Sequence, residues 1–199
     1  MNLNEFIDQT YSDLRILRDN FFSPFARFLS GAGITANHIT NLRLVLGVLF
    51  FIFFFSYPFF AIALITVAWI LDGIDGPLAR VQKSESAKGK FLDIFVDLIL
   101  YALIAFTLGE YVSNKLIIGI NVFVITCLFV VVCLDKNKNI LSFAHWKSPV
   151  TIANWYKNAV VFSFYFVHFF SIDFVEFALV LTTIAGFASF IYHYMSFQR

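Results

Sequence analysis

Residues 71–97 read LDGIDGPLARVQKSESAKGKFLDIFVD, and this stretch sets four aspartates in apolar sequence on either side of a short basic turn. The aspartates are Asp72, Asp75, Asp93 and Asp97. An ionised carboxylate inside a bilayer is strongly unfavourable unless a counter-charge compensates it, so such residues indicate a functional site. The counter-charge that this group predicts is a divalent metal ion, with a phosphate bound to the metal.

The composition is that of a membrane protein. Of the 199 residues, 60% are hydrophobic and 20% aromatic, and the mean hydropathy is +0.81. Soluble domains contain about half apolar residues. The net charge of +1 supports no bulk attraction to nucleic acid. The acidic N-terminal residues are unlike a cleavable signal peptide, and two cysteines in apolar sequence predict no disulfide framework.

The apolar segments predict an all-α, polytopic membrane fold. One span requires about 20 apolar residues at about 1.5 Å each. The apolar run 44–71 is too long for one span and too short for two, unless each helix includes polar residues at its cytoplasmic end. On that basis we predict six transmembrane helices, at residues 37–57, 59–80, 89–110, 116–134, 150–170 and 174–194.

Residues 1–30 predict an amphipathic helix that lies in the membrane interface, because apolar and charged residues alternate at helical spacing. Packing under the bundle is a simpler role for it than lipid sensing. Pro24 and the glycines of 31–33 are expected to end or bend it. The chain then divides into a juxtamembrane segment, residues 1–36, and a six-helix transmembrane domain with the four aspartates, residues 37–199.

Lysine and arginine set the predicted orientation. They gather in the N-terminal segment, in the turn 80–90, in the segment between the fourth and fifth spans and at the C-terminus, all on one side of the predicted helices. The positive-inside rule therefore places both termini and the turn in the cytoplasm. Asp72 lies eight residues before Arg80, about 12 Å along the helix, so we expect a site recessed in the membrane and open to the cytosol.

The spacing of the four aspartates predicts that their side chains come together between two neighbouring helices. Asp72 and Asp75 are three residues apart and Asp93 and Asp97 are four apart, so each pair lies on one face of its helix. The two helices are antiparallel neighbours, so the faces can meet. No histidine or cysteine belongs to the group, and hard oxygen ligands favour Mg²⁺, Mn²⁺ or Ca²⁺ over Zn²⁺.

Glycines flank these acids. Gly73 and Gly76 lie beside the first pair and Gly89 precedes the second, and they favour room for a bulky ligand, although close helix packing also uses glycine. Arg80 can bind a phosphate through two parallel hydrogen bonds, or it can anchor the end of the helix at the membrane surface.

Residues 72–97 resemble the complete signature of the CDP-alcohol phosphotransferases (CDP-alcohol phosphatidyltransferases), here Asp72-x-x-Asp75-Gly76-x-x-Ala79-Arg80, eight residues, then Gly89-x-x-x-Asp93-x-x-x-Asp97. So many fixed positions at fixed spacing make a specific match. The resemblance extends over nearly the whole chain. It implies that a CDP-linked donor, most often CDP-diacylglycerol, reacts with a small alcohol and releases CMP, and it suggests a homodimer.

The resemblance also implies residue roles. Asp72, Asp75 and Asp93 would hold Mg²⁺ or Mn²⁺, and Asp97 would be a further ligand and the general base. The donor's cytidine diphosphate would contact residues that match the signature or lie beside it: Gly76, Arg80, Ser86 and Gly89. Residues 35–43 resemble the family's entry to the first span, so Asn37 and Thr40 would face the nucleotide, although Asn37 is also a good N-cap by itself.

The acceptor alcohol stays open between glycerol 3-phosphate, inositol or its phosphate, serine and an amino-alcohol. Leu98 stands where members that use glycerol phosphate or inositol usually have a basic residue. Lys157, about 10 Å into the fifth span, is expected to bind an acceptor phosphate or the donor diphosphate, or else to reach the surface or pair with an acid.

Two other classes of function compete with this one. Intramembrane acids also suit a divalent-cation transporter, but that class needs polar groups across the whole membrane, and the outer halves of the spans are nearly featureless. An inactive membrane scaffold would have no need for the intact acids. Metal flux into liposomes would favour the transporter, and a lack of bound metal would favour the scaffold.

Overall fold

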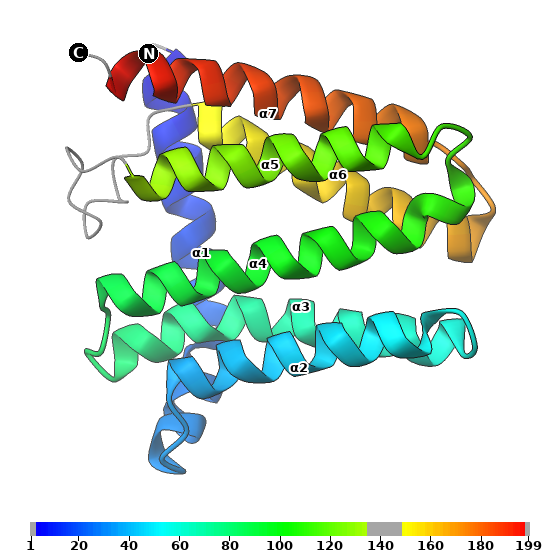
Figure 1. The fold of residues 1–199 in the computed structure, drawn as a ribbon. Helices are drawn as coiled ribbons and strands as arrows, with labels where there is room; N and C mark the ends of the chain where they lie inside the picture. Colours follow the sequence, from blue (N-terminus) through cyan, green and yellow to red (C-terminus); the bar gives the residue numbers. More distant parts are fainter. Residues whose placement is uncertain (1–2, 135–148, 198–199) are drawn as a thin grey trace. The chain divides into compact units, whose positions relative to one another are not determined.

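The computed structural model describes residues 3–134 and 149–197, and every regular element in these ranges is a helix (Figure 1). The order is α1 (Leu3–Gly31), α2 (Ala36–Phe54), α3 (Pro58–Val81), α4 (Ala87–Thr107), the 3₁₀ turn η1 (Leu108–Tyr111), α5 (Leu116–Leu134), α6 (Pro149–Phe170) and α7 (Val175–Phe197). The all-α prediction is confirmed for the described residues, and the predicted helix ranges lie close to those of α1 to α7.

Three of the described helices are long and apolar enough to cross a membrane. These stretches are Ala36–Phe54, Pro58–Val81 and Ala87–Tyr111, the last formed by α4 and η1. Shorter apolar stretches follow at Leu116–Val130, Ala159–Phe170 and Val175–Ile191. Many large apolar side chains point outward, among them Phe59, Phe123 and Phe177. The chain is therefore a membrane protein.

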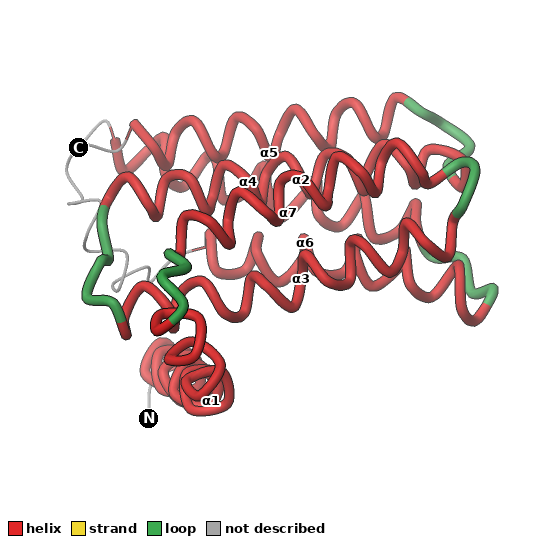
Figure 2. Tube along the Cα trace, turned by 90° about the horizontal axis from the view of Figure 1, so that it is seen from below, coloured by secondary structure: helices red, strands yellow, loops and turns green. Residues whose placement is uncertain are grey.

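The chain forms two compact units, an N-terminal unit of residues 1–96 and a C-terminal unit of residues 97–199. In the N-terminal unit, α2 and α3 lie side by side and antiparallel. The first helix, α1, packs on α3 but runs across it, and Figure 2 shows α1 almost end-on while α2 and α3 are seen along their lengths. In the C-terminal unit, α7 packs against both α5 and α6.

The junction between α1 and α2 is fixed by backbone hydrogen bonds. The N–H of Ile34 donates to Leu29 and that of Gly33 to Ser30, and Gly33 has a φ of +76°. This is the Schellman arrangement, which favours glycine because an L side chain is strained at such a φ. The ending near Gly33 was predicted, but α1 continues through Pro24. The proline is exposed, and residues on both sides of it pack against α3.

Helix α2 begins with a capping box. Thr35 Oγ1 accepts from the N–H of His38, and the His38 ring accepts from the N–H of Thr35. The suggestion that Asn37 caps this helix is therefore wrong, because Thr35 takes that position and Asn37 lies within the first turn. The side chain of Gln82, just after α3, donates to the carbonyl of Ile34 at 2.7 Å. That bond joins the end of α3 to the start of α2.

A buried amide joins the helices of the C-terminal unit. Asn121 on α5 is fully buried, and its side chain donates to the Leu179 carbonyl and to Thr183 on α7, each at 3.0 Å. The hydroxyl of Tyr101 on α4 donates to Asn121 at 2.6 Å. Buried polar groups must be satisfied in this way, so the network fixes the register of α5 against α7.

Candidate functional site

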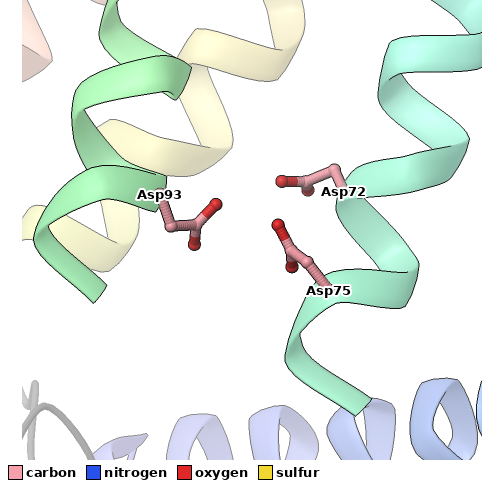
Figure 3. Close-up of side chains that lie close together, drawn as sticks. All are labelled: Asp72, Asp75 and Asp93. Atoms are coloured by element: carbon pink, nitrogen blue, oxygen red, sulfur yellow. The ribbon is translucent and has the colours of Figure 1, made fainter. Parts of the chain in front are cut away.

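Three of the four predicted aspartates meet in the N-terminal unit. Asp72 and Asp75 project from α3 and Asp93 projects from α4, and the three side chains point toward one another (Figure 3). One carboxylate oxygen from each residue lies within 4.8 Å of the others. The predicted meeting of the two helix faces is confirmed for these three residues, which we call the aspartate cluster.

An arginine from a third helix joins the aspartate cluster. Arg43, near the middle of α2, has only 1% of its side chain exposed. Its Nη2 pairs with Asp72, and its Nη1 lies 2.7 Å from Asp75 Oδ2 and 2.6 Å from Asp93 Oδ1. One planar guanidinium therefore fixes all three carboxylates at once. Arg43 was not among the predicted site residues, although an arginine inside an otherwise apolar span is a recognisable signal.

Thr40 supports the same cluster from one turn earlier on α2. It is buried, and its hydroxyl lies 3.3 Å from Asp75 Oδ2 and 3.2 Å from the carbonyl of Ala36. Asp75 is therefore held from two sides, by Arg43 and by Thr40. The predicted contact of Thr40 with a nucleotide stays a prediction.

The aspartate cluster fits a divalent cation. Three carboxylates against one guanidinium leave a formal charge of −2, because 3 negative charges minus 1 positive charge remain. All the ligand atoms in the cluster are hard oxygens, which suit Mg²⁺ or Mn²⁺. The side chains of Asp72 and Asp93 are 44% and 39% exposed, so an ion can reach them. Asp75, by contrast, is buried.

A second charged group lies one to two turns further along α3. Arg80 Nη2 is 2.5 Å from Asp19 Oδ1 on α1, and Arg80 Nη1 is 3.7 Å from Glu85 in the turn that follows α3. A Cβ placed at Gly76 would lie 3.4 Å from Arg80 Nη2 and 3.5 Å from the guanidinium of Arg18. Two guanidinium groups therefore lie against the bare backbone of Gly76. The contribution of α1 was not predicted.

Three of the predicted donor-binding residues come together where α4 begins. The hydroxyl of Ser86 accepts from the N–H of Gly89 at 3.1 Å, so Ser86 caps the helix. A Cβ at Gly89 would lie 3.2 Å from that hydroxyl and 3.5 Å from Oδ1 of Asn37. Residues from α2, the turn and α4 thus lie close together at Gly89, where even a methyl group would be a tight fit.

Gly73 serves packing rather than ligand access. A Cβ at this position would lie 2.7 Å from Cε2 of Phe22 on α1, so the aromatic ring fills the space that the sequence suggested was for a ligand. Phe22 packs beside a small apolar core that α1, α2 and α3 share, with the members Ala26, Leu29, Ile39, Ile74 and Leu78. Gly73 therefore fixes how α1 sits on α3.

We expect Gly73→Ala to weaken the packing of α1 on α3. The added methyl forces the Phe22 ring to move, and overpacking of this kind costs roughly 1–3 kcal/mol. Thermal unfolding in detergent should show a lower midpoint. The matched control is Gly119→Ala on α5, where a Cβ would meet nothing within 4 Å and which should leave the midpoint unchanged or slightly higher. Equal midpoints for both variants would contradict the role of Gly73.

Two predicted residues are not placed in these groups. Asp97 lies one turn beyond Asp93 on α4 and is not one of the three clustered acids. Its roles as ligand and base stay predictions. Lys157 lies in α6, but its side chain is outside the described part of the chain.

Two sequence comparisons relate the chain to known proteins. The chain is 38% identical over 81 residues to the inner membrane protein YnjF of Escherichia coli (strain K12), and the match covers 40% of this chain and 39% of the relative. The chain thus spans about two fifths of that relative's length. No solved structure matches it. The sequence profile of the CDP-alcohol phosphatidyltransferases matches residues 33–191, a range that contains Arg43 and the whole aspartate cluster. The chain therefore belongs to the CDP-alcohol phosphatidyltransferase family.

Proposed function

We propose that the protein transfers a phosphatidyl group from CDP-diacylglycerol, or a related CDP-alcohol, to a small alcohol and releases CMP. The observation that carries the proposal is the aspartate cluster held by Arg43, inside the range that matches a transferase family. Asp72, Asp75 and Asp93 would hold Mg²⁺ or Mn²⁺. A cation bound there supplies neutralisation of the donor's diphosphate.

The chain's own residues then divide the work. Arg43 holds the three carboxylates close together but neutralises only part of their charge, because the cluster retains a net charge of −2. Arg80 and Gly76 receive the donor's diphosphate, one as a charged donor of hydrogen bonds and the other by leaving room. Asp97, one turn beyond Asp93, accepts the proton of the attacking hydroxyl as a general base and adds a further carboxylate to the metal site.

The remaining polar residues would hold the nucleotide. Asn37, Ser86 and Gly89 lie together at the start of α4, and their amide, hydroxyl and backbone groups suit a cytidine and its ribose. Thr40 lies one turn along α2 from Ala36, and its hydroxyl contacts Asp75. The diacylglycerol chains stay in the lipid beside the exposed apolar faces of the helices.

The membrane arrangement belongs to the same proposal. The six apolar stretches cross the bilayer, both termini and the site face the cytoplasm, and two copies form a homodimer. Residues 1–36 are a juxtamembrane segment, and residues 37–199 form the catalytic domain. On α1, Leu17, Phe21, Phe25 and Phe28 are exposed along one side, as a helix in the membrane interface requires.

The test is an assay of CMP release by the purified protein with CDP-diacylglycerol, Mn²⁺ or Mg²⁺ and a panel of alcohols. We expect release with at least one acceptor and its loss on chelation of the metal.

Asp97→Asn should abolish release but leave Mn²⁺ bound to the other three acids. Lys157→Ala should change the acceptor profile. Full activity of Asp97→Asn would remove the proposed base, and an unchanged profile for Lys157→Ala would remove its acceptor role.

The same purified protein can distinguish the transferase from the competing function, a divalent-cation transporter. If no acceptor gives metal-dependent CMP release while liposomes that contain the protein take up Mn²⁺, the protein is a divalent-cation transporter and the proposal is wrong. The identity of the phospholipid formed, read by mass spectrometry after incubation with mixed acceptors, assigns the alcohol.

A further inference from the structure

We propose that Arg18 on α1 is a second phosphate-binding guanidinium, paired with Arg80 above Gly76, and that Asp19 is a place-holder that the donor's diphosphate displaces. The inference rests on the proposed function, because it assumes that the anion is the diphosphate of a CDP-alcohol. It extends the site beyond residues 33–191, the range that the family profile matches.

The positions of the two arginines are the first support. A Cβ at Gly76 would lie 3.4 Å from Nη2 of Arg80 and 3.5 Å from Nη2 of Arg18, so both guanidinium groups reach the same patch of bare backbone. Two like charges this close repel unless an anion lies between them. A diphosphate presents several oxygens and at least two negative charges, which suits a pair of forked guanidinium donors.

Asp19 already marks where an anion binds. Its Oδ1 lies 2.5 Å from Arg80 Nη2 and 3.6 Å from Arg18 Nε, so one carboxylate oxygen reaches both arginines. All three side chains are partly exposed. Ion pairs with such exposure contribute only about 0–1 kcal/mol, so a ligand with more charge displaces the carboxylate at little cost. Glu85, 3.7 Å from Arg80, then remains as a weaker partner in the turn.

The packing of α1 on α3 holds Arg18 and Asp19 next to α3. Phe22 lies one turn after Arg18 and packs over Gly73, and Gly73 lies one turn before Gly76. Ala26 and Leu29 continue the same face into the shared apolar core. The contact between α1 and α3 therefore carries Arg18 and Asp19 to Gly76 and Arg80. On this arrangement α1 supplies part of the donor site as well as an apolar face for lipid.

The experiment compares Arg18→Ala with Arg27→Ala, which removes the same charge from an exposed position on the same helix. Two quantities are measured for each: the KM for CDP-diacylglycerol in CMP release, and the Kd for CDP in the presence of Mn²⁺ by titration calorimetry. Loss of charged hydrogen bonds to phosphate should raise both values about tenfold or more for Arg18→Ala. Arg27→Ala should leave both unchanged, since a shared loss would point to general membrane electrostatics.

Asp19→Asn tests the place-holder directly. The carboxamide keeps the shape of Asp19 but no longer competes as an anion, so the Kd for CDP should fall. A rise in Kd would mean that Asp19 positions Arg80, and it would overturn the place-holder. Arg18→Lys keeps the charge but loses the two parallel hydrogen bonds of a guanidinium, so its Kd for CDP should lie between those of the wild type and Arg18→Ala. This variant keeps the proposal testable if Arg18→Ala fails to fold.

The outcomes for the two proposals are distinct. If the wild type releases CMP but Arg18→Ala and Arg27→Ala behave alike, the donor chemistry holds and the role of Arg18 is wrong. If the wild type binds CDP, Arg18→Ala weakens that binding and no acceptor yields CMP, the transferase proposal fails and the role of Arg18 in binding the diphosphate holds.

Discussion

Asp93→Asn is expected to lower metal-dependent CMP release by more than about 100-fold, which exceeds the usual cost of removing a group that only supports a metal ligand. Asparagine has nearly the shape of aspartate, and its carbonyl oxygen can still accept from Arg43. The change removes one of three negative charges, so the cluster no longer matches a divalent cation. The loss should appear in both CMP release and Mn²⁺ binding.

The control for Asp93→Asn is the same chemical change at Asp173, an exposed residue between α6 and α7. Its carboxylate accepts from the N–H of Val175, so a small change in stability is expected there but no change in Mn²⁺ affinity. Both variants should elute as folded protein and unfold cooperatively. If Asp93→Asn keeps release within about tenfold of the wild type, the loss is smaller than that caused by removing a group that only supports a metal ligand. The cluster is then not the metal site.

The helices and the clustered acids were predictable because local pattern determines them. Apolar length marks each helix of the bundle, and spacings of three and four residues place each pair of acids on one face. A short turn between two neighbouring helices then brings Asp72 and Asp75 to Asp93. Each of these steps needs only residues that are close in the sequence.

What was not predicted depends on contacts between distant segments. Helical periodicity shows that α1 is amphipathic but not which residues it lays on α3, so the pair Asp19 and Arg80 was missed, and Gly73 was assigned to a ligand instead of Phe22. The cap of α2 was missed for a local reason, because Asn37 was considered for it and Thr35 was not. The capping box with His38 decided it.

Arg43 shows the same limit most clearly. The sequence contains a charged residue in the first span, but its three partners are 29, 32 and 50 positions away. Only the packing of α2 on α3 and the ion pair of Arg43 with Asp93 on α4 identify them. Without Arg43 the cluster would be three unpaired carboxylates, and a metal ion would have to balance their whole negative charge. With Arg43 in place, one charge is already balanced and the position of each carboxylate is fixed before any cation binds.

Arg43→Ala is therefore expected to damage the site in two separable ways. Removing one partner of a buried ion pair costs about 3–5 kcal/mol, and the lower end applies because Asp72 and Asp93 are partly exposed. The thermal midpoint in chelator should fall accordingly. Mn²⁺ should then raise the midpoint more in Arg43→Ala than in the wild type, because the cluster charge becomes −3 and a cation that binds only the folded protein stabilises it.

Stability restored by Mn²⁺ should not restore catalysis. Saturating Mn²⁺ replaces the lost charge of Arg43 but not the planar group that holds three carboxylates in one arrangement, so CMP release should stay about 10–100-fold below the wild type. Arg43→Lys separates the two effects, since it keeps the charge and loses the fork. It should melt close to the wild type yet release CMP nearly as slowly as Arg43→Ala. Wild-type rates in Arg43→Lys would show that charge alone is sufficient, and would contradict the positioning role that the geometry gives to the guanidinium.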